Sequence, residues 1–204
     1  MNQMNLPNKL TVIRLLMVPL CIIFIVLEKW MNADLAAFIA ALLFSAASLT
    51  DMADGKIARK RNLVTDFGKF LDPVADKFLV IGCMMAVVLR YDNIRDWYFW
   101  VTLCVIAREF AVTSLRLVVS KSTGTVVAAN WLGKVKTTVQ IINILLVLME
   151  PVLYRVLLPA CAARDFLVKW IPLTAVSSAL VVIFTLWSGF NYICCYGKFL
   201  KESM

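Results

Sequence analysis

The sequence contains no histidine, and its six cysteines form no CxxC pair. Histidine is the commonest general base and metal ligand, so any catalysis would rest on carboxylates, lysine, arginine or hydroxyl groups. Without paired CxxC motifs, a structural zinc site is not expected. The cysteines fall mostly in apolar stretches, where a free thiol behaves as a small hydrophobic side chain, and we interpret them as structural.

Charged residues are also scarce, at 17% of 204 residues, whereas 62% are hydrophobic and the mean hydropathy is +0.83. A soluble domain has about 45–50% apolar residues, and one small soluble core could not hide this excess. The net charge is +8. Because the lysines and arginines lie between apolar runs, we expect membrane lipids and phosphorylated substrates as partners, and no nucleic acid.

Six apolar stretches predict an all-α integral membrane protein with six transmembrane helices in a single domain, 1–204. They cover about 10–27, 35–49, 70–89, 97–119, 135–149 and 171–192. The second is short, and we expect its helix to continue with a polar end through Thr50–Arg59. The stretch 153–168 is broken by Pro159 and charges, and predicts a loop or a surface helix. We treat the first stretch as a retained anchor, because Arg14 and Pro19 interrupt it and no clear cleavage site follows.

The basic residues divide unequally between the two ends of these helices. Fifteen of the 21 lysines and arginines fall on the side that holds both termini, and six fall on the other. The positive-inside rule makes the first side cytoplasmic. The sequence therefore predicts a multi-pass protein of the bacterial inner membrane, with both termini in the cytoplasm.

Four aspartates gather on that cytoplasmic side, in the segment 51–77. Asp51 and Asp54 are three residues apart, and Asp72 and Asp76 are four apart, so each pair shares one face of a helix. A short loop, roughly 60–67, would let the two helices pack antiparallel and bring the four carboxylates together. Such carboxylates repel one another unless divalent cations bind, and hard oxygen ligands suit Mg²⁺ or Mn²⁺. One aspartate at a helix end would more simply cap the helix or pair with a lysine, but four on adjacent helices favour a functional site.

Smaller and basic residues accompany the aspartates. Gly55, Ala58 and Gly68 would let a substrate approach the backbone closely, and Arg59 could hold a phosphate through two hydrogen bonds. The full spacing resembles the defining motif of the CDP-alcohol phosphotransferase family, with all eight positions present: Asp51-x2-Asp54-Gly55-x2-Ala58-Arg59-x8-Gly68-x3-Asp72-x3-Asp76.

The resemblance implies a six-helix membrane domain, usually a homodimer, that binds two divalent metal ions at the cytoplasmic face. It implies that Asp51, Asp54, Asp72 and Asp76 ligate the metals and that Asp76 is also the general base on the acceptor hydroxyl. It further implies binding of CDP-diacylglycerol by a larger set of residues: Asn8, Thr11, Gly55, Ala58, Arg59, Thr65 and Gly68.

Other segments are similar to family members that use glycerol 3-phosphate as the acceptor: Leu6–Thr11 with Arg14, Phe67–Lys77, Arg108–Phe110 with Arg116, and Trp131–Thr137. The dianionic phosphate of that acceptor needs fixed positive charge. The candidates on the cytoplasmic side are Arg108, Arg116, Lys134 and Lys136. The same residues could instead bind lipid headgroups or mark orientation.

The expected activity is transfer of a phosphatidyl group from CDP-diacylglycerol to glycerol 3-phosphate. One alternative keeps the chemistry and changes the acceptor, as in synthases of cardiolipin, phosphatidylserine or phosphatidylinositol phosphate. A remoter alternative is a cation transporter with carboxylates in the membrane. The chain shows no internal repeat, and the aspartates cluster at one membrane face, which disfavours transport.

Overall fold

The computed structural model describes residues 6–27, 31–61, 66–123 and 131–202, which form seven helices and no strand. Helix α6 (Ala162–Trp170) has nine residues, and the others have 21 to 31. The long helices are α1 (Leu6–Val26), α2 (Ala33–Arg61), α3 (Asp66–Arg90), α4 (Arg95–Thr123), α5 (Trp131–Leu157) and α7 (Pro172–Glu202).

Each of the six predicted apolar stretches lies within one long helix or extends at most one residue beyond its end, so the helical prediction is confirmed. Helix α2 does continue through Thr50–Arg59 and ends at Arg61. The stretch 153–168 contains the end of α5, a short connection and most of α6. Four segments of the described chain are long and apolar enough to cross a membrane: Ala33–Thr50, Arg95–Arg116, Trp131–Leu157 and Ala162–Cys195. The apolar part of α1, Thr11–Val26, is shorter.

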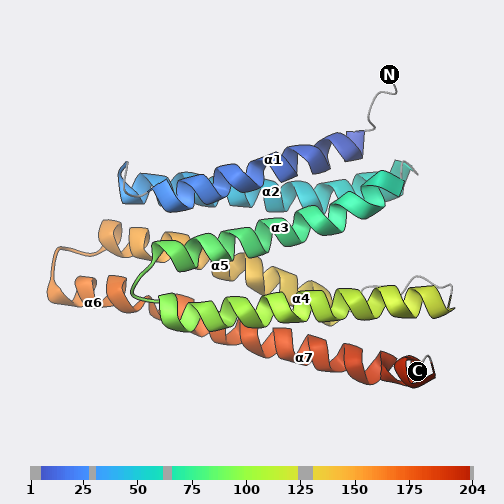
Figure 1. The fold of residues 1–204 in the computed structure, drawn as a ribbon. Coiled ribbons are helices and arrows are strands. Elements are labelled where there is room, and N and C mark those ends of the chain that lie inside the picture. The colour runs from blue at the N-terminus through green and yellow to red at the C-terminus, as the bar shows by residue number, and fades with distance from the viewer. Residues whose placement is uncertain (1–5, 28–30, 62–65, 124–130, 203–204) are drawn as a thin grey trace.

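The long helices form an antiparallel bundle in which α1 begins and α7 ends at the same end (Figure 1). Helix α1 packs on α2 and α3, whereas α7 packs on α4 and α5. Helix α5 also contacts α2 and α3, and therefore joins the two groups. The end of α2 and the start of α3 lie at the bundle end that holds the start of α1 and the end of α7 (Figure 1).

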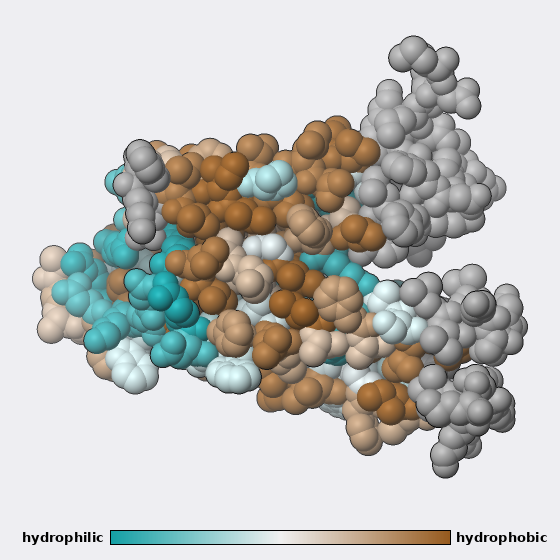
Figure 2. All heavy atoms as spheres, in the orientation of Figure 1, coloured by the Kyte–Doolittle hydropathy of each residue, from teal (hydrophilic) through white to brown (hydrophobic). Residues whose placement is uncertain are grey.

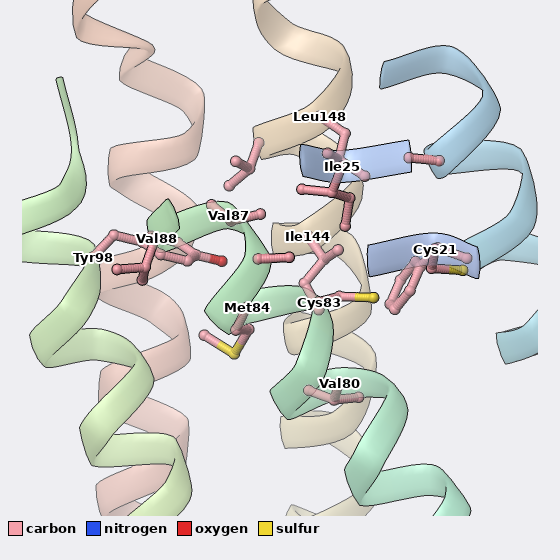
Figure 3. Close-up of a cluster of buried hydrophobic side chains, with 14 of the residues drawn as sticks. Cys21, Ile25, Val80, Cys83, Met84, Val87, Val88, Tyr98, Ile144 and Leu148 are labelled. Atoms are coloured by element: carbon pink, nitrogen blue, oxygen red, sulfur yellow. The ribbon is translucent and has the colours of Figure 1, made fainter. Parts of the chain in front are cut away.

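The apolar core runs through the middle of this bundle. Figure 3 shows Cys21 and Ile25 of α1 near Cys83 of α3, with Ile144 and Leu148 of α5 beside them. Small side chains let helices approach closely here. A Cβ atom on Gly82 of α3 would lie 3.1 Å from Ile22 Cδ1 of α1, so glycine suits this contact.

Large apolar side chains also cover the outside of the bundle. Leu16, Trp100 and Phe190 are each more than 60% exposed, and they lie on three different helices. Apolar side chains cover the middle of the molecule, while hydrophilic ones gather at the end that holds α6 (Figure 2). A continuous apolar exterior fits lipid rather than water as the surrounding solvent, so the protein is a membrane protein.

Inside the bundle, buried polar side chains form hydrogen bonds between helices. Tyr98 of α4 donates a hydrogen bond to Asn143 Oδ1 of α5 at 2.9 Å. Asn143 Nδ2 donates to Ser177 and Ser178 of α7 at 2.7 and 2.8 Å. All four side chains are buried, and no water in a membrane interior could replace these bonds. The network therefore fixes the register of α4, α5 and α7.

A second buried contact determines where α7 begins. Ile171 ends α6 in the left-handed region at φ 35°, and Pro172 is the first residue of α7, a position that proline favours. The Glu150 carboxylate of α5 accepts hydrogen bonds from the backbone N–H groups of Leu173 and Thr174 at 2.9 and 2.7 Å. It thus satisfies donors that the first turn of a helix leaves unpaired.

We expect Asn143→Leu to lower the stability of the bundle, because it leaves Tyr98, Ser177 and Ser178 without their shared partner. The expected loss is about 1 kcal/mol, which corresponds to a melting temperature lower by about 3 °C for a chain of this size. Thermal unfolding of the detergent-purified protein measures it. Thr138→Val, which removes an exposed hydroxyl from the same helix, is the control. Equal melting temperatures for the two variants would contradict a stabilising network.

Candidate active site

The motif aspartates lie on two consecutive helices at one end of the bundle. The backbone is helical over 51–61 and 66–76, so Asp51 and Asp54 share one face of α2, and Asp72 and Asp76 share one face of α3. Thr65 lies outside the described residues. So do the side chains of 51–61 and 66–73, which include Gly55, Ala58, Arg59 and Gly68. Asp76 is the motif aspartate whose side chain is described.

Asp76 lines a small cavity between α3, α4 and α5. Its volume is about 30 Å³, which is room for about one water molecule. The cavity is lined by Asp76, Lys77, Val80, Ile81, Glu109, Lys136, Thr137 and Gln140. It therefore brings one predicted catalytic residue, Asp76, together with one predicted phosphate ligand, Lys136.

The two lysines that line this cavity are held by side chains of a neighbouring helix. Lys136 is only 4% exposed, and its ammonium forms an ion pair with Glu109 Oε1 of α4. Lys77, adjacent to Asp76, donates a hydrogen bond to the Thr113 hydroxyl of α4. That hydroxyl in turn donates to the backbone oxygen of Glu109 at 2.6 Å. Residues of one helix, α4, therefore hold both lysines of the cavity.

Gln140 gives the cavity an open polar position. Its side chain is 2% exposed, and its Nε2 finds no hydrogen-bond partner in the described part of the chain. A buried amide donor without a partner costs free energy, which a polar ligand or water in the cavity would recover. The cavity thus offers donors, acceptors and both signs of charge within a few side chains.

Arg108 lies next to the cavity but is directed away from it. Its guanidinium donates a hydrogen bond to Ser188 of α7 and lies over the Tyr192 ring, 5.8 Å from the centroid. Its Nη1 is 3.5 Å from Glu109 Oε1. The Arg108 side chain also lies against the backbone of α7 at Gly189, where a Cβ atom would be 3.4 Å from Arg108 Cγ. Arg108 thus connects α4 to α7.

The remaining predicted residues are spread more widely. Lys134 is exposed and does not line the cavity, and Arg116 lies on α4 two turns beyond Arg108 and Glu109. Thr11 and Arg14 of α1 are buried, at 1% and 0% exposure. The side chain of Asn8 lies outside the described residues. Lys136 is therefore the predicted phosphate ligand that the structure brings to the cavity with Asp76.

Sequence reasoning assigned no role to Glu109, Lys77 or Gln140. A signal existed for Glu109, because a carboxylate inside an apolar stretch is costly unless it is paired or functional. Its partner Lys136 is 27 positions away, on the next helix, so the pair could be identified only from the three-dimensional arrangement of α4 and α5.

A larger cavity, about 500 Å³, lies at the opposite end of the bundle. It is lined by Arg90, Tyr91, Asp92, Asn93, Pro151, Arg155, Asp165, Val168 and Lys169. Two of its charges are used in ion pairs: Arg155 joins α5 to Asp34 of α2 at 2.5 Å, and Asp165 pairs with its neighbour Arg164 at 3.1 Å. None of the predicted site residues whose side chains the structure describes lines it. The chemistry therefore places the candidate site at the Asp76 cavity rather than at the larger one.

Comparison with known proteins defines the class. The family described as CDP-alcohol phosphatidyltransferase matches residues 4–187, nearly the whole chain. The chain belongs to this family.

Several individual relatives carry the same name. The chain is similar to the CDP-diacylglycerol–glycerol-3-phosphate 3-phosphatidyltransferase of Bacillus subtilis strain 168, with 39% identity over 98% of each chain. Proteins of the same name from Escherichia coli K12 and Rickettsia felis are 35% and 46% identical. The match to the Escherichia coli protein spans 94% of each chain. The match to the Rickettsia felis protein spans 67% of this chain and 70% of the relative.

We expect Arg108→Gln to destabilise the protein by roughly 2 kcal/mol, because it removes the contacts to Ser188 and Tyr192 and leaves Glu109 with one cation fewer. The melting temperature in detergent measures the effect. Lys134→Gln, at an exposed position of α5, should change stability by less than about 0.5 kcal/mol. A similar effect of the two substitutions would show that Arg108 does not join α4 to α7.

Proposed function

We propose that the protein transfers the phosphatidyl group of CDP-diacylglycerol to the primary hydroxyl of glycerol 3-phosphate, giving phosphatidylglycerophosphate and CMP. The observation that carries the proposal is the cavity in which Asp76, the last aspartate of the family motif, lies with the buried ammonium of Lys136. The names of the relatives support the same substrates.

The reaction we propose is a direct displacement. Asp76 takes the proton of the acceptor hydroxyl, and the hydroxyl oxygen forms a bond to the β-phosphorus of CDP-diacylglycerol. The bond between that phosphorus and the oxygen of CMP breaks, and CMP leaves. Lys136 holds the acceptor phosphate, and Arg108, Arg116 and Lys134 add positive charge at the same bundle end. Positioning and charge neutralisation account for most of the rate.

Asp51, Asp54, Asp72 and Asp76 would hold the divalent ions. Their oxygen donors and their placement on the facing ends of α2 and α3 suit Mg²⁺ or Mn²⁺. Such ions, when bound, neutralise the charge that develops on the transferred and leaving phosphate groups. Asn8, Thr11, Gly55, Ala58, Arg59, Thr65 and Gly68 would bind CDP-diacylglycerol along the same ends of α1, α2 and α3.

The membrane arrangement belongs to the proposal. We place α1 and α3 across the bilayer beside the four longer apolar segments, which makes six crossings in a single domain. The end that holds Asp76 then faces the cytoplasm of a bacterial cell, with both termini, because most basic residues lie on that side. Two copies of the chain would form the homodimer usual in the family.

Replacing Asp72 with asparagine removes one carboxylate from the proposed metal site and keeps the size of the side chain. We expect CMP release to fall by at least about a thousandfold, because the reaction depends on charge neutralisation at the phosphates. The amount of protein in the membrane should be unchanged. Asp96→Asn, a change near the start of α4 at the other end, is the matched control and should retain activity. Near-normal turnover of the Asp72 variant would refute the metal assignment.

The acceptor is tested by competition. Purified protein receives CDP-diacylglycerol and Mg²⁺ with an equal mixture of glycerol 3-phosphate, serine, inositol phosphate and phosphatidylglycerol, and mass spectrometry identifies the lipid formed. We expect phosphatidylglycerophosphate as the main product, and no product after removal of divalent ions with EDTA. A different main lipid product would support the same phosphatidyl transfer with another acceptor. No lipid product from folded protein would contradict the proposed function.

A further inference from the structure

Glu109 is a carboxylate that forms ion pairs with cations at the Asp76 end of the bundle. It lies in the middle of α4, its side chain is 13% exposed, and it forms the ion pair with Lys136 of α5. A buried ammonium without a nearby carboxylate is strongly unfavourable, so the position of Lys136 depends on what lies opposite it. The family motif ends at Asp76 and does not include Glu109.

Two other cations lie near Glu109, and each also contacts further residues: Arg108, which forms a longer ion pair with Glu109, and Lys77. Arg108 makes its close contacts with Ser188 and Tyr192 of α7, and its distance to Glu109 is 3.5 Å. Lys77 donates a hydrogen bond to the Thr113 hydroxyl. Of the two lysines that line the cavity, Lys136 is therefore the one that the Glu109 carboxylate positions.

Lysine needs such a partner more than arginine would. Its ammonium lies at the end of a flexible chain of four carbons, and ordering that chain costs up to about 2 kcal/mol. The ion pair with Glu109 selects one orientation, in which the ammonium borders the cavity that also contains Asp76. A ligand phosphate then meets a cation that is already in place, and less of its binding free energy is lost in ordering.

We propose that Glu109 is a positioning residue for the acceptor phosphate: it acts through Lys136, whose ammonium it holds at the edge of the Asp76 cavity. This inference rests on the proposed function and extends it to a residue outside the family motif. Glu109 itself touches neither the reacting oxygen nor the phosphorus. It determines the affinity for an acceptor that carries a phosphate, and not the affinity for CDP-diacylglycerol.

Glu109→Gln removes the charge and keeps the shape of the side chain. We expect the KM for glycerol 3-phosphate to rise about tenfold, a change worth about 1.4 kcal/mol. The KM for CDP-diacylglycerol should change by less than about twofold, and kcat should change less than the KM for the acceptor. Glu109→Asp, which keeps the charge on a shorter side chain, should restore part of the affinity.

A double-mutant cycle tests whether Glu109 acts through Lys136. In a Lys136→Gln background, adding Glu109→Gln should raise the KM for glycerol 3-phosphate by less than about twofold. Glu150→Gln is the matched control, since it removes the buried carboxylate that caps α7 at the opposite end. It should lower the melting temperature without changing either KM.

Equal effects of Glu109→Gln in both backgrounds would overturn the inference, as would an unchanged KM for the acceptor or equal increases for both substrates. Equilibrium binding of radiolabelled glycerol 3-phosphate to the purified variants gives the same comparison without turnover. In this binding assay, Glu109→Gln should raise the Kd for glycerol 3-phosphate about tenfold in the wild-type background. In the Lys136→Gln background the same substitution should raise it less than twofold. If the wild-type protein bound the acceptor but released no CMP, the proposed function would fail while the binding cycle still decided the role of Glu109.

Discussion

Every charge that this bundle buries needs a partner inside the bundle, and the Lys136–Glu109 ion pair is where that constraint has the largest consequence. The exterior is apolar and the interior offers no bulk water, so an unpaired ammonium on α5 would be strongly destabilising. The ion pair between Lys136 and Glu109 links α5 to α4 through their side chains and fixes the register of the two helices. Arg108 extends the contact to α7 through Ser188 and Tyr192, so one charged cluster orders three helices around the Asp76 cavity.

The two ends of the bundle use buried polar groups differently. At the α6 end, Glu150 satisfies the first backbone N–H groups of α7, and ion pairs such as Arg155–Asp34 join neighbouring helices. Those groups are satisfied by the protein itself. At the Asp76 end, the buried Nε2 donor of Gln140 finds no hydrogen-bond partner among the described residues, so it is left for a ligand. That asymmetry is expected of an enzyme whose substrates and cations all carry charge.

Much of this architecture was predictable from the sequence. Apolar runs of sufficient length predicted the six long helices, and the polar extension of α2 past Thr50 was expected because the apolar run alone is short. The motif placed Asp76 at a helix face without any knowledge of packing. Contacts between distant helices were not predictable, because Lys136 with Glu109 and Asn143 with Ser178 are joined by tertiary packing and not by spacing along the chain. For the same reason, the sequence could not separate Lys136, beside Asp76, from the exposed Lys134.

The central claim is that the cavity between α3, α4 and α5 receives the acceptor. An experimental structure of the protein with glycerol 3-phosphate and Mg²⁺, in the absence of CDP-diacylglycerol, tests it most directly. The account predicts the acceptor in an enlarged Asp76 cavity, with its phosphate within hydrogen-bond distance of Lys136 Nζ and its primary hydroxyl directed toward the Asp76 carboxylate. An acceptor bound elsewhere, with the Lys136–Glu109 cavity unchanged, would contradict the account.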